Sequence, residues 1–220
     1  MKKDTIIFDL DGTLLDTLED LTNATNAALH YHGFAARSLE EVRMFVGNGI
    51  GNLIKKAVPA GTAKEDYDTV LAYFKDYYEM HCMDKTGPYE GIPELLEQLS
   101  EKGYRMAIVS NKIDSAVKEL NDRFFGTYVS VAVGEQEGMQ RKPAPDMVLE
   151  ALCRLGAEKE SAVYIGDSQV DLQTAENSGL NCISVLWGFR DREELEENGA
   201  RVFAETPADI IEILESKSEW

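Results

Sequence analysis

Short apolar segments alternate with amphipathic segments after residue 84, and this alternation limits the folds open to the chain more than any other feature. Strands are expected over residues 104–109, 128–133, 162–165, 181–186 and 201–203, and helices over 94–102, 113–123, 145–155, 171–177 and 207–214. Such alternation is typical of a parallel sheet with right-handed crossovers. The sequence therefore predicts an α/β fold, a Rossmann-like core of three layers with helices on both faces of a parallel sheet.

An earlier apolar run, Thr5 to Asp9, predicts the first strand of the same sheet. A short apolar run that ends at a glycine turn suits a strand covered on both faces. Asp9 and Asp11 then fall at the carboxyl end of the strand, where open α/β sheets place their ligands. Two acids this close repel one another unless a cation or a shared proton relieves them. An ordinary turn at Asp11 and Gly12 is the alternative that this stretch alone leaves open.

Residues 16–84 have a helical pattern and no convincing strand. Ser38, with acids in the turn that follows it, is an N-cap signal. Helices are expected over 16–32, from Ser38 onward, over 52–58 and over 64–83, with a glycine-rich turn at 46–51. We therefore expect two domains, a core of residues 1–15 and 85–220 and a helical insert of residues 16–84.

The charge and the cysteine usage indicate which partners and which compartment to expect. A formal net charge of -18 makes nucleic acid and anionic membranes poor partners. No run approaches the roughly 18 apolar residues that a membrane span needs, and the N-terminus is too acidic for a signal peptide. Three widely spaced cysteines suit reduced thiols. We expect a cytoplasmic protein with no membrane or nucleic-acid partner; whether it is a monomer or a homodimer stays open.

Polar residues follow each of the predicted strands at its carboxyl end. In a parallel sheet these ends share one edge, so residues far apart in the sequence can converge there. Carboxylate and carbonyl oxygens suit Mg²⁺, while a hydroxyl and backbone amides suit phosphate oxygens. The set comprises Asp9, Asp11, Ser110, Asn111, Lys142, Asp167 and Asp171.

Three members of this set also have ordinary explanations. Lys142 could belong to a plain loop before a helix, Ser110 could be an N-cap, and Asp171 could be an acid at a helix start.

Four ordered motifs in the chain resemble those of the haloacid dehalogenase-like hydrolase superfamily. They are Asp9-Leu10-Asp11-Gly12-Thr13, Ser110-Asn111, Lys142-Pro143 and Gly166-Asp167-Ser168-Gln169-Val170-Asp171. The helical insert is similar to the C1 cap of that superfamily. The chain most resembles the phosphoglycolate phosphatase group, through the run from Asp11 to Thr17, Val46-Gly47-Asn48-Gly49 and Trp187-Gly188.

The resemblance implies a chemical role for each core residue. Asp9 is expected to be the nucleophile that forms an aspartyl-phosphate, and Asp11 the general acid and base. Ser110 and Lys142 are expected to hold the phosphoryl oxygens. Mg²⁺ is expected on the Asp9 carboxylate, the Asp11 carbonyl and Asp167, with Asp171 supporting the metal. The substrate-binding residues implied are Gly12, Thr13 and Asn111 in the core and Arg43, Gly47 and Asn48 in the insert.

The function so implied is Mg²⁺-dependent hydrolysis of a small phosphorylated metabolite, such as a phosphoglycolate-like monoester. A sugar phosphomutase of the β-phosphoglucomutase type, a pyrophosphatase or a nucleotidase on the same core stays open. A dehalogenase would lack the second acid, and Asp11 is present. A phospho-accepting receiver module also combines acids with Lys-Pro, but it is much shorter and has no helical insert.

Overall fold

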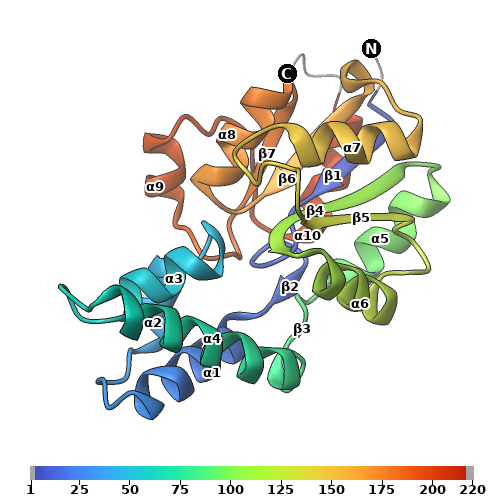
Figure 1. Ribbon diagram of the computed structural model, residues 1–220. Coiled ribbons are helices and arrows are strands. Elements are labelled where there is room, and N and C mark those ends of the chain that lie inside the picture. The colour runs from blue at the N-terminus through green and yellow to red at the C-terminus, as the bar shows by residue number, and fades with distance from the viewer. Residues whose placement is uncertain (1–2, 217–220) are drawn as a thin grey trace. The chain divides into compact units, whose positions relative to one another are not determined.

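A six-stranded parallel sheet forms the centre of the larger of two units into which the chain divides (Figure 1). The computed structural model describes residues 3–216. In sheet order the strands are β5 (Val131–Glu135), β4 (Arg105–Ile113), β1 (Thr5–Phe8), β6 (Ala162–Gly166), β7 (Asn181–Val185) and β8 (Phe203–Ala204). All the pairings between these strands are parallel.

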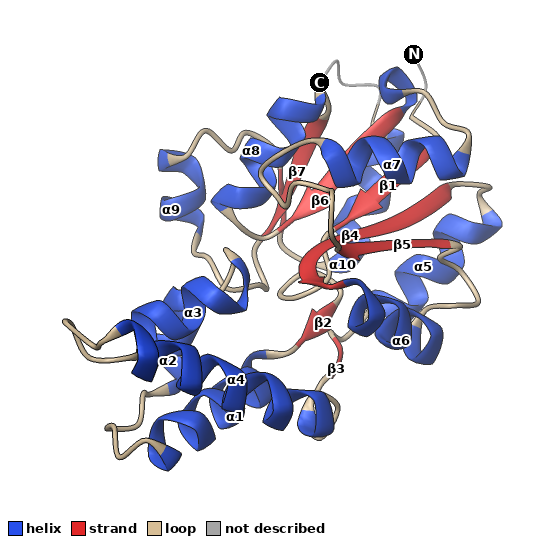
Figure 2. Cartoon of the chain, viewed as in Figure 1, coloured by secondary structure: helices blue, strands red, loops and turns tan. Residues whose placement is uncertain are grey.

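Helices cover both faces of this sheet (Figure 2). The helices of this unit are α5 (Ile92–Glu101), α6 (Asp114–Phe124), α7 (Asp146–Leu155), α8 (Gln169–Ser178), α9 (Arg192–Glu197) and α10 (Pro207–Glu215), of which α9 lies to the side of the sheet. Buried residues of α7 and α8 share one apolar cluster with Ile7 and Tyr164 of the sheet, whereas α5 and α10 pack against each other. The predicted α/β class, a parallel sheet between two helical layers, is confirmed.

The position of β1 decides where the functional residues meet. β1 lies between β4 and β6, and Phe8 is paired with Ile108 on one side and with Ile165 on the other. All four side chains of β1 are buried, as its apolar sequence predicts. Since the three strands run in parallel, the residues that follow them emerge at the same edge of the sheet.

Several elements differ from the predicted boundaries. β4 runs to Ile113, with a register shift after Val109, so that Ser110 and Asn111 lie in an irregular part of a strand and not beyond its end. β5 begins at Val131 and not at residue 128, because Tyr128 and Val129 donate backbone hydrogen bonds to Phe125 in a turn. The short helix α9 was not predicted, since its sequence Arg-Glu-Glu-Leu-Glu-Glu has almost no apolar period.

The smaller unit, residues 16–87, is helical. Its helices are α1 (Leu18–Tyr31), α2 (Leu39–Phe45), α3 (Gly49–Ala57) and α4 (Lys64–His81). Ser38 caps α2 through a reciprocal capping box with Glu41, as its sequence indicated. α3 begins at Gly49, earlier than the expected start at residue 52. That this unit acts as a cap stays a prediction.

Asp20 ties the end of the smaller unit to its first helix. Its buried carboxylate accepts hydrogen bonds from the backbone N–H groups of Lys85 and Thr86 and from the Thr86 hydroxyl, at 2.8–3.1 Å. These bonds explain why the division falls between residues 87 and 88, later than the expected residue 85. The chain passes between units at β2 (Leu15–Asp16) and β3 (Gly87–Pro88), which pair with each other.

We expect Asp20→Ala to lower the free energy of unfolding by about 2–4 kcal/mol, because the buried N–H and hydroxyl of Thr86 lose their acceptor. The neighbouring exposed residue supplies a matched control, Glu19→Ala, which should change stability by less than about 0.5 kcal/mol. Urea unfolding followed by circular dichroism measures both. Equal stability of the two variants would contradict the anchoring role.

Candidate active site

Asp9 follows the central strand β1 and lies in a buried polar cluster. Its carboxylate oxygen Oδ1 is 2.7 Å from the Nζ atom of Lys142, and the same Nζ is 2.8 Å from Oδ1 of Asp171. All three side chains are buried: Asp9 is 6% exposed, Lys142 4% and Asp171 0%. The ammonium of Lys142 therefore bridges two carboxylates that come from different parts of the sequence.

Two further residues fix the position of Lys142. The Asn111 side chain accepts a hydrogen bond from the backbone N–H of Lys142 and donates one to its carbonyl, at 2.8 and 3.1 Å. The hydroxyl of Tyr164, on β6, lies 3.1 Å from the Lys142 ammonium and 3.0 Å from Asp171. The Asn111 side chain thus positions Lys142; a contact of Asn111 with substrate stays a prediction.

Three buried carboxylates form the acidic part of the site. Asp9, Asp167 and Asp171 each offer an oxygen, and these oxygens lie within 4.8 Å of one another. Asp167 accepts a hydrogen bond from the backbone N–H of Phe189 at 2.7 Å. Asp171 accepts hydrogen bonds from the backbone and the hydroxyl of Ser168 in a capping box at the start of α8.

The charges of this cluster do not balance. Burial and the nearby charge of Asp171 raise the pKa of Asp9 well above its usual value, against the opposing effect of Lys142. Burial and Asp171 also raise the pKa of Asp167 to about 7. Burial opposes the charge of Lys142, but Asp171 and Asp9 outweigh it, and its pKa is raised. With all three acids ionised, one ammonium would leave an excess of negative charge, and oxygen ligands at this spacing fit a hard divalent cation that would balance it.

Asp11 has a different partner from the other acids. Its Oδ1 atom lies 2.9 Å from Nζ of Lys112, and the two side chains are 17% and 6% exposed. The Asp11 carboxylate is not part of the three-carboxylate group. The sequence analysis did not select Lys112, although it directly follows Ser110 and Asn111 at the same strand end.

Close packing at the edge of the sheet requires two glycines. A Cβ atom on Gly12, which has φ of 89°, would overlap the carboxylate of Asp167. A Cβ atom on Gly188 would overlap Asp167 and the carbonyl of Gly12. Gly12 and Gly188, which come from different motifs of the sequence, therefore meet at the carboxylate of Asp167.

The other predicted residues of the larger unit lie at the same edge. The Ser110 hydroxyl is buried and accepts a hydrogen bond from the backbone N–H of Lys112 at 3.2 Å. The Thr13 hydroxyl lies 3.4 Å from Asp167, and the indole N–H of Trp187 donates to the Thr13 carbonyl at 3.0 Å. The sequence analysis also did not select Tyr164, whose apolar neighbours on β6 made it resemble a core residue.

Arg43, Gly47 and Asn48 belong to the smaller unit. Arg43, near the end of α2, lies 3.4 Å from Glu40, and Asn48 precedes α3 after Gly47, which has φ of 115°. Their predicted contact with substrate stays a prediction.

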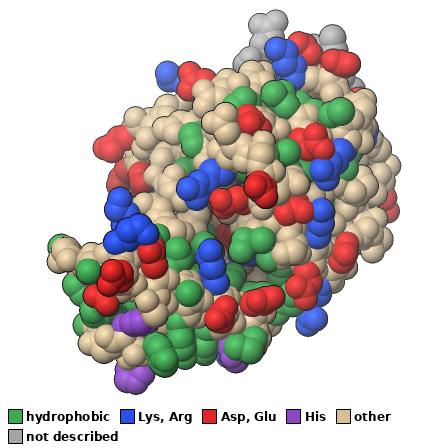
Figure 3. All heavy atoms as spheres, viewed as in Figure 1, with side chains coloured by type: hydrophobic (Ala, Val, Ile, Leu, Met, Phe, Trp, Pro, Cys, Tyr) green, Lys and Arg blue, Asp and Glu red, His purple; other side chains and the backbone are tan. Residues whose placement is uncertain are grey.

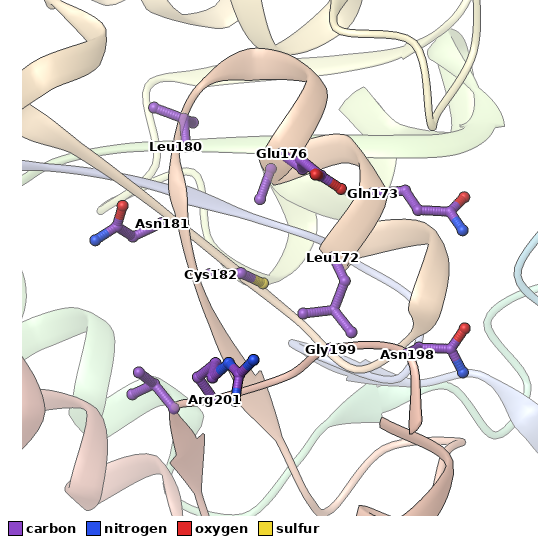
Figure 4. Close-up of a pocket in the computed structure, with 11 residues that line it drawn as sticks. Leu172, Gln173, Glu176, Leu180, Asn181, Cys182, Asn198, Gly199 and Arg201 are labelled. Carbon is purple, nitrogen blue, oxygen red and sulfur yellow. The ribbon is translucent and has the colours of Figure 1, made fainter. Parts of the chain in front are cut away.

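A pocket of about 430 Å³ lies elsewhere in the larger unit, beside α8 and the start of β7 (Figure 4). Its lining includes Leu172, Cys182 and Arg201, and no residue that lines it belongs to the predicted site. Asn181 and Cys182 are the first residues of β7, so this pocket is at the opposite end of the strand from the acidic edge.

Surface charge is mixed on the face drawn in Figure 3. Among the side chains described there, Lys and Arg are scattered between Asp and Glu and form no continuous basic stripe of the kind that binds nucleic-acid backbones. Within residues 3–216, none of the helices combines the length and apolar character needed to cross a bilayer.

A buried lysine and three buried carboxylates at the carboxyl edge of a parallel sheet define a Rossmann-like enzyme core. The model of the haloacid dehalogenase-like hydrolase family matches residues 6–185. The chain belongs to this family, and within it the chain is a phosphoglycolate phosphatase-like hydrolase, as its motifs indicated.

Individual relatives are similar over nearly their whole length. A phosphoglycolate phosphatase from Mesorhizobium japonicum is 32% identical over 98% of this chain and 96% of its own. An N-acetylmuramic acid 6-phosphate phosphatase from Pseudomonas aeruginosa is 28% identical over 98% of this chain and 96% of its own. A crystal structure of a protein from Lactobacillus delbrueckii subsp. bulgaricus, which is named a phosphoglycolate phosphatase by inference, has a TM-score of 0.94 and is 37% identical. The similarity covers 99% of this chain and 100% of that chain.

We expect the contribution of Asp167 to the stability of the metal-free protein to fall as the pH rises from about 4 to about 7. The pKa of Asp167 is about 7 in the folded state and 3.8 in its ordinary state. The folded protein therefore binds more protons than the unfolded protein in this window, and deprotonation favours unfolding.

The variant Asp167→Asn removes this charge and keeps an oxygen for the Phe189 N–H. In the presence of a chelator, the melting temperature of this variant should exceed that of the wild type at about pH 8. The difference should shrink toward about pH 5, where Asp167 of the folded wild type is protonated. If the difference in melting temperature between the variant and the wild type were the same at every pH, this would contradict the raised pKa of Asp167.

Proposed function

We propose that the chain is a Mg²⁺-dependent phosphatase that hydrolyses a small phosphate monoester through an aspartyl-phosphate on Asp9. One observation carries the proposal: the buried Asp9 carboxylate is held 2.7 Å from the Lys142 ammonium, beside Asp167 and Asp171. An anionic nucleophile must approach an anionic phosphate, and a fixed cation beside it lowers the cost of that approach.

In the first step, an oxygen of Asp9 attacks the phosphorus and the bond to the ester oxygen breaks. Asp11 gives its proton to the departing alkoxide. Lys142 fixes the Asp9 carboxylate through one oxygen and places a positive charge where the phosphoryl oxygens gather negative charge. The Ser110 hydroxyl supplies a further hydrogen bond to a phosphoryl oxygen.

In the second step, a water molecule attacks the phosphorus of the aspartyl-phosphate. Asp11, now a carboxylate, takes a proton from this water, and the bond between phosphorus and Asp9 breaks. Inorganic phosphate leaves and both acids return to their starting forms. Gly12 lets the backbone approach the phosphate closely, because it has no Cβ atom.

The excess negative charge of the acidic cluster supports a Mg²⁺ ion as cofactor. Asp9, Asp167 and the carbonyl of Asp11 would hold it, and Asp171 would orient the cluster through Ser168 and Lys142. A bound Mg²⁺ neutralises the repulsion between carboxylates and phosphate.

The substrate class follows from the relatives and not from the core chemistry, which is the same for many esters. The relatives' names include both phosphoglycolate and N-acetylmuramic acid 6-phosphate as substrates. We favour a small phosphoglycolate-like ester. The proposal includes contact of Arg43, Gly47 and Asn48 with the leaving group, in a helical unit that acts as a cap; this part rests on the resemblance alone.

Asp9→Asn should lower kcat for p-nitrophenyl phosphate by roughly 10⁴–10⁶-fold, because an amide cannot be the nucleophile. Asp122→Asn, an exposed carboxylate on α6, is the matched control and should keep wild-type activity. Circular dichroism checks that both variants fold. Substantial turnover by Asp9→Asn would disprove the assignment of the nucleophile.

Removal of divalent cations should abolish turnover, and added Mg²⁺ should restore it. Ca²⁺ should not restore it, because calcium prefers longer bonds and more ligands. The measurement is phosphate release after exhaustive EDTA treatment and stepwise addition of each ion. Full activity in EDTA would rule out the metal.

A further inference from the structure

The ion pair of Lys112 with Asp11 has no role in the two steps above. The pair is short, at 2.9 Å, and the Lys112 side chain is only 6% exposed. A buried ammonium loses most of its hydration and so needs an anion beside it. Its partner here is the acid that the proposed function places against the ester oxygen of the substrate.

This position puts the Lys112 ammonium next to the leaving group. To protonate the leaving oxygen, the Asp11 carboxylate must come within hydrogen-bond distance of it. Lys112 is itself within hydrogen-bond distance of that carboxylate. Atoms attached to the ester oxygen on its alcohol side therefore lie within reach of the ammonium.

The other buried cations at this edge have different partners. Lys142 bridges Asp9 and Asp171 on the side of the nucleophile. Arg190 lies beside Glu194 and Gln169. Lys112, by contrast, pairs with Asp11, the proposed general acid.

We propose that Lys112 is a specificity residue that binds the carboxylate of a substrate in which a 2-hydroxy acid carries the phosphate. This inference rests on the proposed function and assigns a residue that recognises the alcohol side of its substrate. In such an ester three bonds separate the ester oxygen from a carboxylate oxygen, a span of about 3 Å. The ammonium can therefore exchange its contact with Asp11 for the substrate carboxylate by a small side-chain rotation. An ester of a neutral alcohol offers no anion there for Lys112 to bind.

The test compares two esters of nearly equal size, 2-phosphoglycolate and 2-hydroxyethyl phosphate. The wild type should have the higher kcat/KM for 2-phosphoglycolate. Lys112→Met should reduce that kcat/KM by roughly 10–100-fold more than the kcat/KM for 2-hydroxyethyl phosphate, the range for one hydrogen bond to a charged group. Lys112→Arg should keep part of the preference. Lys118→Met, which removes an ammonium paired with Asp114 on α6, is the matched control and should leave the ratio unchanged.

A binding measurement keeps this inference separable from the proposed function. Calorimetry compares 3-phosphonopropionate with propylphosphonate, which are unreactive analogues with and without the carboxylate. If the wild type binds 3-phosphonopropionate more tightly than propylphosphonate and Lys112→Met loses this difference, the carboxylate subsite is supported. This holds even if neither ester is hydrolysed, in which case only the proposed function fails. Equal loss on both esters, or equal binding of both phosphonates by the wild type, overturns the inference even if the protein is an active phosphatase.

Discussion

The contact of Lys142 with Asp9 and Asp171 is the interaction on which the rest of the site depends. It joins the end of β1, the segment before α7 and the first turn of α8 through one buried ammonium. A buried charge is stable only when paired and hydrogen-bonded, so each element must hold its place for the contact to survive. Tyr164 from β6 and the Asn111 side chain from β4 complete the surroundings of Lys142.

The same contact explains why the site is prepared for phosphate chemistry. One ammonium cannot balance three carboxylates. The pKa values of Asp9 and Asp167 are raised because burial and the nearby carboxylates make it costly to ionise these acids. A site that holds excess charge in this way resembles the strained arrangements that proteins keep where they act on a ligand. Binding of the proposed divalent cation would relieve the repulsion, so that stability and function would depend on the same charges.

The sequence predicted the frame of the site better than its contacts. Apolar runs that end in Asp9 and Gly166-Asp167 marked the ends of central strands, and the parallel sheet brings these ends to one edge. Spacing does not reveal which side chains touch, so Lys112 and Tyr164 were missed and the hydrogen bonds of Asn111 to Lys142 were not predicted. The irregular end of β4 and the charged helix α9 depend on tertiary contacts that no local pattern records.

The central claim is that Asp9 itself carries the phosphoryl group. Treatment with borohydride during turnover reduces an acyl phosphate to an alcohol, which converts the aspartate that bears it to homoserine. Mass spectrometry of the peptide around β1 should then find homoserine at position 9 and an unchanged Asp11, in the presence of substrate only. An unmodified Asp9 in an enzyme that is turning over, or homoserine at another aspartate, would contradict this account.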